Sequence, residues 1–378
     1  MTENNAPLTP VQKRLNGSHF DILREPPSKS EVLFLNTILC QTSLPISKRK
    51  LSGVDVWERT NGRAVLKIKT GEIAMPNGII VKTEIPYGRF ARLFFYHLCT
   101  RIVKEGKRDI ELASSFQQFA KSIGIHTTGR ELANLRTQVY NILGCEFLIH
   151  NFTETEQART SQTSFMRIAD DIKLWLPKGL NQLEINIDDA TNIRISERFF
   201  ETTRQHAIPF DPRAIGALTH NCLAMDVLGW LTQLLPRLDH QKWKPISWGF
   251  LYNMYGHSYD RLRDFRKYFL ESLHQAISVY PAASRGVMLS DELDEYGSQK
   301  LLLRYAPPMV GHTTVYIPQA TAAHKNQLKQ EAEKKAQEHV DWQRSMKTAK
   351  ETGDLLRQKK AAIKKLAEQT NPPKTLNE

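Results

Sequence analysis

The feature that most constrains this sequence is a pair of apolar helical patterns joined by a tight turn, between Lys242 and Tyr280. The first pattern is short, and Gly256 ends it. In the second pattern apolar residues recur at steps of three and four, which predicts a longer helix with one buried face. The residues on that face are Leu262, Phe265, Phe269, Leu273, Ala276 and Ile277.

Cationic residues fall on the other side of this second helix. Arg263, Lys267 and His274 are expected to point away from the apolar stripe. A helix of this kind suits a DNA major groove, because its stripe holds it to its own domain and its free side meets phosphates and base edges. The alternative is an ordinary helical hairpin with solvated charges.

A second segment, Arg130 to Leu143, follows the same pattern. Its apolar residues are expected to face inward, and its polar residues, Arg130, Asn134, Thr137 and Asn141, are expected to face outward. CEFLIHNF and SFMRIADDIKLWL, which follow, are predicted to form a hairpin. We interpret that hairpin as the wing that comes after a recognition helix in winged-helix folds.

The chain divides into two halves with the same predicted order of elements. In each half a strongly apolar helix, FARLFFYHLCTRIV or NCLAMDVLGWLTQLLPRL, precedes the polar-faced helix and a hairpin. The predicted fold class is therefore α+β, with two tandem winged-helix domains. We expect a disordered arm at residues 1–30, domains at 31–180 and 181–318, and a basic, partly helical or disordered tail at 319–378.

Charge and composition narrow the class of protein. The chain has 378 residues, 40% of them hydrophobic, and a net charge of +12, which favours association with polyanions. Its four cysteines show no CxxC spacing and are interpreted as reduced core residues. No apolar run approaches the roughly 20 residues that cross a bilayer, and the first residues do not form a secretory signal. We therefore expect a cytoplasmic protein without a membrane partner.

Sequence motifs for enzymatic chemistry are not found. The chain has no P-loop, GxGxxG, HExxH or CxxC motif, so we expect a non-enzymatic protein without metal or cofactor. Two adjacent carboxylate pairs, Asp170-Asp171 and Asp188-Asp189, could serve a Mg²⁺ nuclease, but they also fit loop or capping positions. The tyrosines near Tyr259 would suit a nicking enzyme, but the paired-His motif of such enzymes is missing.

Several segments resemble one known family over roughly residues 35–310, in the same order and spacing. They are ILCQTSLP, WERTNGRAVLKI, PYGRFARLFFYHLCT, ISERFF, HAIPFDPRAIGAL, LAMDVLGWL, PISWGFLYNMYG and YDRLRDFRKYF. The family is that of plasmid-encoded RepA replication initiators. The resemblance implies a protein that binds repeated sites (iterons) in double-stranded origin DNA, promotes local opening, and recruits host DnaA and the replicative helicase. It also implies two winged-helix domains, and a homodimer is a further candidate partner.

The candidate DNA-binding residues are chosen from the outward faces of the two predicted recognition helices. Arginine and lysine suit guanine and asparagine suits adenine, so the outward residues of the two helices are the predicted base readers. The candidates are Arg130, Asn134, Thr137, Asn141, Arg261, Arg263, Arg266, Lys267 and His274. Arg89, Arg92, Arg136 and Arg266 lie nearer the apolar faces and are expected to bind phosphates or snorkel, and Arg167 is a candidate wing contact. A sequence-specific winged-helix transcriptional regulator or autorepressor remains the alternative, which tandem repeats beside the coding region would disfavour.

Overall fold

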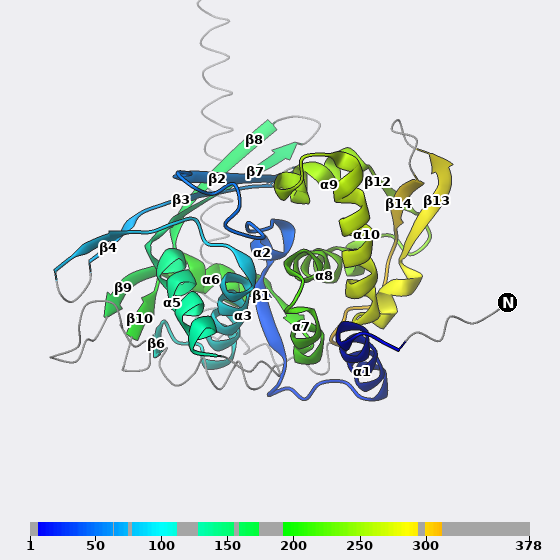
Figure 1. The fold of residues 1–378 in the computed structure, drawn as a ribbon, viewed down its shortest axis with the longest axis horizontal. Helices are drawn as coiled ribbons and strands as arrows, with labels where there is room; N and C mark the ends of the chain where they lie inside the picture. The colour runs from blue at the N-terminus through cyan, green and yellow to red at the C-terminus, as the bar shows by residue number, and fades with distance from the viewer. Residues whose placement is uncertain are drawn as a thin grey trace, which may run out of the picture. The chain divides into compact units, whose positions relative to one another are not determined.

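A computed structural model describes residues 7–62, 64–74, 78–111, 128–154, 159–173, 192–293 and 299–311. The described part mixes helices and sheets, which confirms the α+β class (Figure 1). Its helices are α1 (Pro10–Arg24), α2 (Thr37–Gln41), α3 (Gly88–Glu105), α5 (Gly129–Gly144), α6 (Glu197–His206), α7 (Pro212–Leu218), α8 (Cys222–Leu234), α9 (Trp248–Tyr255) and α10 (Leu262–Ser278). Its strands are β1 (Leu33–Asn36), β2 (Val56–Asn61), β3 (Ala64–Lys69), β4 (Glu72–Ala74), β5 (Ile80–Lys82), β6 (Asp109–Glu111), β7 (Glu146–Glu154), β8 (Arg159–Arg167), β9 (Ala169–Lys173), β10 (Asn192–Ile195), β11 (Ala207–Phe210), β12 (Lys244–Ile246), β13 (Val287–Leu293) and β14 (Gln299–Leu303).

Two helices that the sequence marks as apolar form the centre of one hydrophobic cluster. Of the residues in α3, most are buried, including Phe94, Leu98 and Ile102. Helix α8 is buried in the same cluster and packs against α2, α7 and α10. The predicted central position of both helices is confirmed, and Figure 1 shows α8 between α7 and α10.

The two halves share part of their order of elements around these helices, although in the first half β7 and β8 come between α5 and β9. In the second half, α8, β12, α9, α10, β13 and β14 follow one another, and the sheet order is β12-β14-β13. In the first half, α3, β6, α5, β9 and β10 appear in that order, and the sheet order is β6-β10-β9. In each sheet the strand that comes last in the sequence, β14 or β10, is the middle strand. Its neighbours are the strand that follows the central helix, β12 or β6, and the strand that precedes the last one, β13 or β9.

The first predicted wing needs a correction. Residues 164–176 were expected to form one strand of a hairpin, but the chain changes sheets within them: β8 pairs with β7, whereas β9 pairs with β10. Ile168 and Ala169 are both buried, and two consecutive buried residues break the alternation of a single strand. The β7–β8 hairpin is real, but it extends a sheet of order β2-β3-β7-β8.

One further strand prediction changes in the structure. The alternation in RAVLKIKTG (residues 63–71) and IIVKTEI (residues 79–85) predicts a β-hairpin or two neighbouring strands. In the structure β3 instead lies between β2 and β7, and β5 pairs with the short strand β4. The predicted domain boundary at residue 181 lies outside the described residues and stays a prediction. Strand β10 follows that boundary in sequence and pairs with β6 and β9, which precede it.

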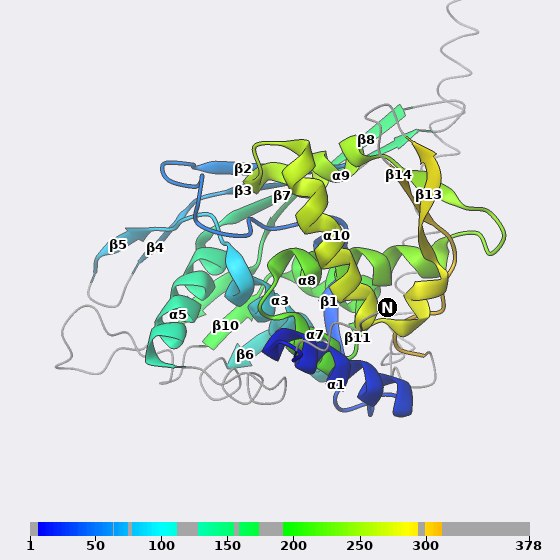
Figure 2. The same cartoon turned by 45° about the vertical axis from the view of Figure 1, so that its right-hand side comes forward.

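The prediction that residues 1–30 are disordered is wrong for Pro10–Arg24, which form α1. Thr9 caps this helix by accepting a hydrogen bond from the Gln12 backbone, and the Gln12 side chain accepts one from the Thr9 backbone. Pro10 occupies the first turn, where its missing N–H costs nothing. The helix packs against α7 and α10 (Figure 2). The predicted tail, residues 319–378, lies outside the described residues.

The cysteines agree with the interpretation from sequence. All four are free thiols; Cys40, Cys99 and Cys145 are buried and Cys222 is half-buried. Burial raises the pKa of Cys99 to about 12 and that of Cys145 to about 11, which keeps both protonated at neutral pH.

His97 makes the stability of the fold depend on pH. The residue is 4% exposed on α3, and burial, with a smaller contribution from the Arg101 guanidinium, lowers the pKa of His97 to about 3. Unfolded histidine binds a proton near pH 6.5, so the unfolded state gains protons first as pH falls. We expect His97 to reduce the free energy of unfolding by up to about 1.4 kcal/mol per pH unit between pH 6.5 and 3.

The measurement is urea unfolding of the wild type and of His97→Gln at pH 7 and pH 5. The variant keeps hydrogen-bonding groups but does not titrate, so its stability is expected to fall less between the two pH values. Equal losses in the two proteins would mean that His97 already accepts a proton in the folded state.

Candidate nucleic-acid interface

Helix α10 presents one buried face and one exposed face, as its sequence pattern predicts. Phe265, Phe269 and Leu273 are each 2% exposed or less, and the helix packs against α8. Arg263, Lys267 and His274, by contrast, are exposed. The predicted outward orientation of these three side chains is therefore confirmed.

The start of α10 adds a further exposed cation. Arg261 is the N-cap residue of the helix and is exposed, and its side chain makes no capping hydrogen bond. Next to it, Asp260 forms an ion pair with Lys50, Oδ1 to Nζ 2.5 Å. Because Lys50 lies between β1 and β2 in the chain, this pair connects the start of α10 to the first half.

Arg266 differs from its neighbours on α10. It is half-buried, and its guanidinium carbon lies 5.0 Å from the centroid of the Trp248 ring, a cation–π contact. The Trp248 indole N–H donates to the carbonyl of Gln299 on β14, 2.7 Å away. Arg266 thus covers the buried tryptophan that links α9 to the β13–β14 hairpin, in agreement with the expected snorkelling.

A stacked aromatic pair, one ring exposed and one half-buried, lies beside the cations. Sequence analysis considered these tyrosines for a nicking enzyme and not as DNA contacts. Tyr268 is 49% exposed and stacks on Tyr259, with ring centroids 5.5 Å apart. The Lys267 ammonium is 6.0 Å from the Tyr268 centroid. An aromatic residue at a position outside the apolar stripe of a cationic helix is the sequence signal that would have identified it.

Helix α5 has a comparable exposed face. Its N-cap is Thr128, whose side chain accepts from the Glu131 backbone while the Glu131 carboxylate accepts from the Thr128 backbone. Leu135, Val139, Ile142 and Leu143 are buried, as predicted. Arg130, Asn134 and Thr137 are exposed on the same side of the helix.

The predicted outward orientation of Asn141 is wrong. The residue is 4% exposed, and its side-chain oxygen accepts a hydrogen bond from the backbone N–H of Glu84 at 2.9 Å. Gln138, one turn earlier, accepts from the backbone N–H of Tyr87 at 2.8 Å. The segment that leads into α3 covers the C-terminal part of α5, and helical periodicity alone contains no information about that segment.

The arginines expected to bind phosphates have different environments. Arg89 forms an ion pair with Glu131 and lies over the Phe90 ring, and Arg136 is half-buried. Arg92 is 5% exposed, so the expectation that it snorkels or binds phosphate is wrong. Its guanidinium forms an ion pair with Asp226 on α8, Nη2 to Oδ2 2.6 Å.

The candidate wing contact and the carboxylate pairs are placed as follows. Arg167 is exposed at the end of β8 and forms an ion pair with Glu146 on β7, 2.8 Å. Asp170 and Asp171 are exposed on β9, and Asp170 is held by Arg108. Asp188 and Asp189 lie outside the described residues. Within the part of the chain that the structure describes, no cluster of three or more His, Cys, Asp or Glu could hold a metal ion.

One observation bears on the prediction that the protein has no membrane partner. Among the helices described, none combines the length and the apolar character that a membrane span requires.

Comparison with known proteins finds one family that the central part of the chain resembles. A family model for plasmid replication proteins matches residues 85–249. The model is described as "Plasmid encoded RepA protein", which confirms over this segment the resemblance to the RepA family. The matched segment contains α3, α5 and α8, and it ends in the first turn of α9, before α10.

Two solved structures of RctB are also similar to the chain. A selenomethionine derivative of its domains 2 and 3 covers 71% of this chain and 97% of its own, with 11% identity and a TM-score of 0.45. The structure of RctB domains 2–3 covers 70% of this chain and 95% of its own, with 13% identity and a TM-score of 0.42. No curated protein matches the chain.

Proposed function

We propose that this protein is a plasmid replication initiator that binds double-stranded DNA through the exposed faces of α5 and α10. The observation that carries the proposal is the RepA family match over residues 85–249, together with the cationic exposed side of a helix in each half. The net charge of +12 supports a polyanionic partner. In this role the protein binds and organises DNA and does not act as an enzyme.

Each half is a winged-helix domain in this proposal. The order of helices and strands, with the last strand in the middle of a three-stranded sheet, supports that assignment in both halves. Helix α5 is the recognition helix of the first domain and α10 that of the second. The wings are then formed by the paired strands β9 and β10 and by the paired strands β13 and β14.

The exposed side chains have the chemistry of base and phosphate contacts. Arg263 and Lys267 suit guanine O6 and N7, and Asn134 suits adenine N6 and N7. In this proposal Arg130 and Arg261, which lie at the starts of the two helices, contact phosphates that fix the register of the duplex. The exposed ring of Tyr268 offers an apolar surface to a thymine methyl group.

The RepA family match extends the proposal to the replication origin. We propose that the DNA sites are repeated in tandem beside an AT-rich tract, that binding promotes opening of that tract, and that DnaA and the replicative helicase are recruited there. The same sites could serve control of copy number or of transcription. Binding to a lone operator without tandem repeats would favour the regulator alternative.

The test is selection of duplexes from a random-sequence DNA library by the wild-type protein, followed by footprinting on the enriched sequence. A binding initiator is expected to enrich one sequence and to protect two segments, one for each recognition helix. Failure to enrich any duplex over non-cognate DNA, or equal binding to duplex RNA, would contradict the proposal.

Affinity for the selected duplex is expected to fall steeply with salt. Phosphate contacts release counterions, so the logarithm of the binding constant falls by about 0.9 per contact for each tenfold rise in salt. With contacts from both helices and both wings, we expect at least about a 100-fold loss between 50 and 200 mM salt. Fluorescence anisotropy with the selected duplex measures this slope, and a flat dependence would exclude extensive phosphate contact.

A further inference from the structure

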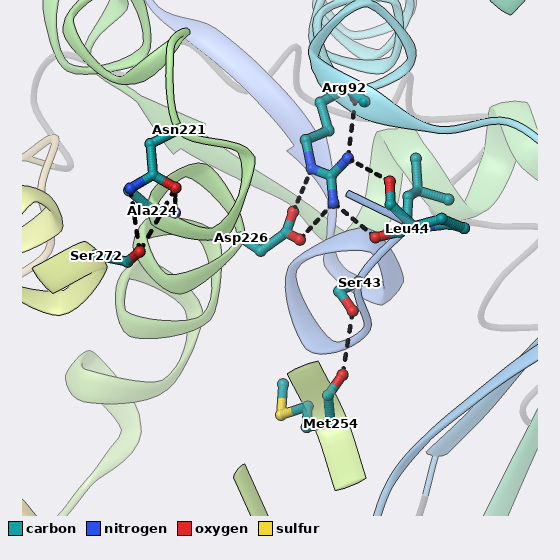
Figure 3. A network of polar contacts seen from close by, with 10 residues as sticks. Ser43, Leu44, Arg92, Asn221, Ala224, Asp226, Met254 and Ser272 are labelled. Carbon is teal, nitrogen blue, oxygen red and sulfur yellow. Dashed lines mark hydrogen bonds and ion pairs between the residues drawn. The ribbon is translucent and has the colours of Figure 1, made fainter. Parts of the chain in front are cut away.

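The central helices of the two halves are joined by a buried ion pair. Arg92 comes from α3 and Asp226 from α8, and the two side chains are 5% and 9% exposed. The guanidinium donates through Nε to Oδ1 at 2.7 Å and through Nη2 to Oδ2 at 2.6 Å, which is the two-pronged geometry of a planar fork (Figure 3). Such a pair fixes orientation as well as distance.

The remaining donors of Arg92 are also bound. Nη1 donates to the carbonyls of Pro45 at 3.1 Å and Gly88 at 2.9 Å, and Nη2 donates to the carbonyl of Leu44 at 2.7 Å. The five hydrogen bonds therefore use all five N–H groups of the guanidinium. Arg92 holds the 44–45 segment, the start of α3 and α8 in one arrangement.

Polar contacts extend from this centre to both recognition helices. Toward α10, Asn221 caps α8 by accepting from the Ala224 backbone, and its amide donates to Ser272 of α10 at 3.1 Å (Figure 3). Toward α5, Gln138 accepts from the backbone of Tyr87, the residue that precedes α3. A series of directional contacts thus runs from α10 through α8 and α3 to α5.

Stability alone does not explain a buried pair at this position. Apolar side chains of similar volume stabilise a core as well as a buried ion pair does, because the pair must first lose its hydration. What the fork provides in addition is a fixed geometry between the elements it joins. Strand β1 of the first half pairs with β11 of the second half, and this pairing also restrains how the two halves are joined.

We propose that Arg92 and Asp226 are positioning residues that fix the distance and angle between α5 and α10, so that the protein measures the spacing between two contact segments on the duplex. The inference rests on the proposed function, because it requires both helices to bind DNA. One inserted base pair moves the second segment by about 3.4 Å and rotates it by about a tenth of a turn. A rigid pair of helices cannot follow both changes.

The first experiment uses the wild-type protein and the duplex that it selects. One to five base pairs are inserted between the two protected segments, and binding is measured by anisotropy. Insertion of one base pair is expected to reduce affinity by about 100-fold, since the contacts of one helix are lost. Affinity that changes less than about threefold with insertion would overturn the inference. Failure to select any duplex would instead contradict the proposed function.

The second experiment replaces the pair by apolar residues, Arg92→Met with Asp226→Leu. This variant is expected to bind the unmodified duplex within about tenfold of the wild type and to lose less than about fivefold on insertion. A merely structural role would weaken binding to every duplex equally and keep the steep dependence on spacing, which would overturn the inference. The matched control is Lys82→Met with Asp55→Leu, an exposed ion pair, Nζ to Oδ1 2.7 Å, outside the proposed interface, whose spacing profile is expected to equal that of the wild type.

Discussion

Replacement of Arg263 and Lys267 by alanine together is expected to weaken binding of the selected duplex by at least about 100-fold. Each side chain is exposed on the side of α10 away from its buried stripe, and a base contact is worth about 1–3 kcal/mol. Alanine is the strongest helix former, so α10 is expected to remain intact. Footprinting and anisotropy measure the loss, and circular dichroism verifies the fold.

The matched control for this variant removes the same charge elsewhere. Lys13 and Arg24 are exposed cations on α1, a helix outside the proposed interface. Their double replacement by alanine is expected to reduce affinity by less than about fivefold, through the general field of the protein. If both double variants lose the same affinity, net charge and not the face of α10 determines binding.

Replacement of Asp226 by alanine is expected to destabilise the protein by about 3–5 kcal/mol, because it leaves the Arg92 guanidinium buried without its counter-charge. Burial would lower the pKa of Arg92, but the carboxylate of Asp226 outweighs it and holds that pKa above its ordinary value, so the charge persists. Urea unfolding measures the change. Arg92→Met with Asp226→Leu is expected to recover most of the lost stability, since no unpaired charge remains.

An exposed ion pair serves as the control for Asp226. Glu84 pairs with Lys48 at 2.8 Å, and both side chains are more than half exposed. Glu84→Ala is expected to cost less than about 1 kcal/mol, the range of surface pairs. A comparably small loss in Asp226→Ala would show that water reaches the Arg92 site.

Helical periodicity correctly predicted the exposed and buried faces of α10 and, except at Asn141, those of α5. The information is local in these helices, since residues three and four apart lie on one face whatever surrounds them. The central position of α3 and α8 followed from the same kind of pattern. Asn141 fits the pattern as well as Asn134 does, and it is buried because the distant residue Glu84 covers it.

The features that sequence analysis missed depend on contacts between distant segments. Arg92 and Asp226 have no local signal that relates one to the other, and a lone arginine in an apolar helix equally suits a snorkelling cation. The change of sheet at Ile168 depends on β10, whose partners are not adjacent in sequence. The sequence did contain an indication of α1, since Thr9, Pro10 and Gln12 form a helix-capping sequence. The helix was not predicted because the composition of the segment is polar.

The buried pair between α3 and α8 also constrains how the chain is synthesised. Arg92 and Asp226 are separated by 134 positions. At 5–20 residues per second, a ribosome needs about 7–27 s to make that length of chain, and during that time the guanidinium has no carboxylate to meet. Helix α3 therefore reaches its final environment only after α8 has emerged, so the N-terminal half matures late although it is translated first.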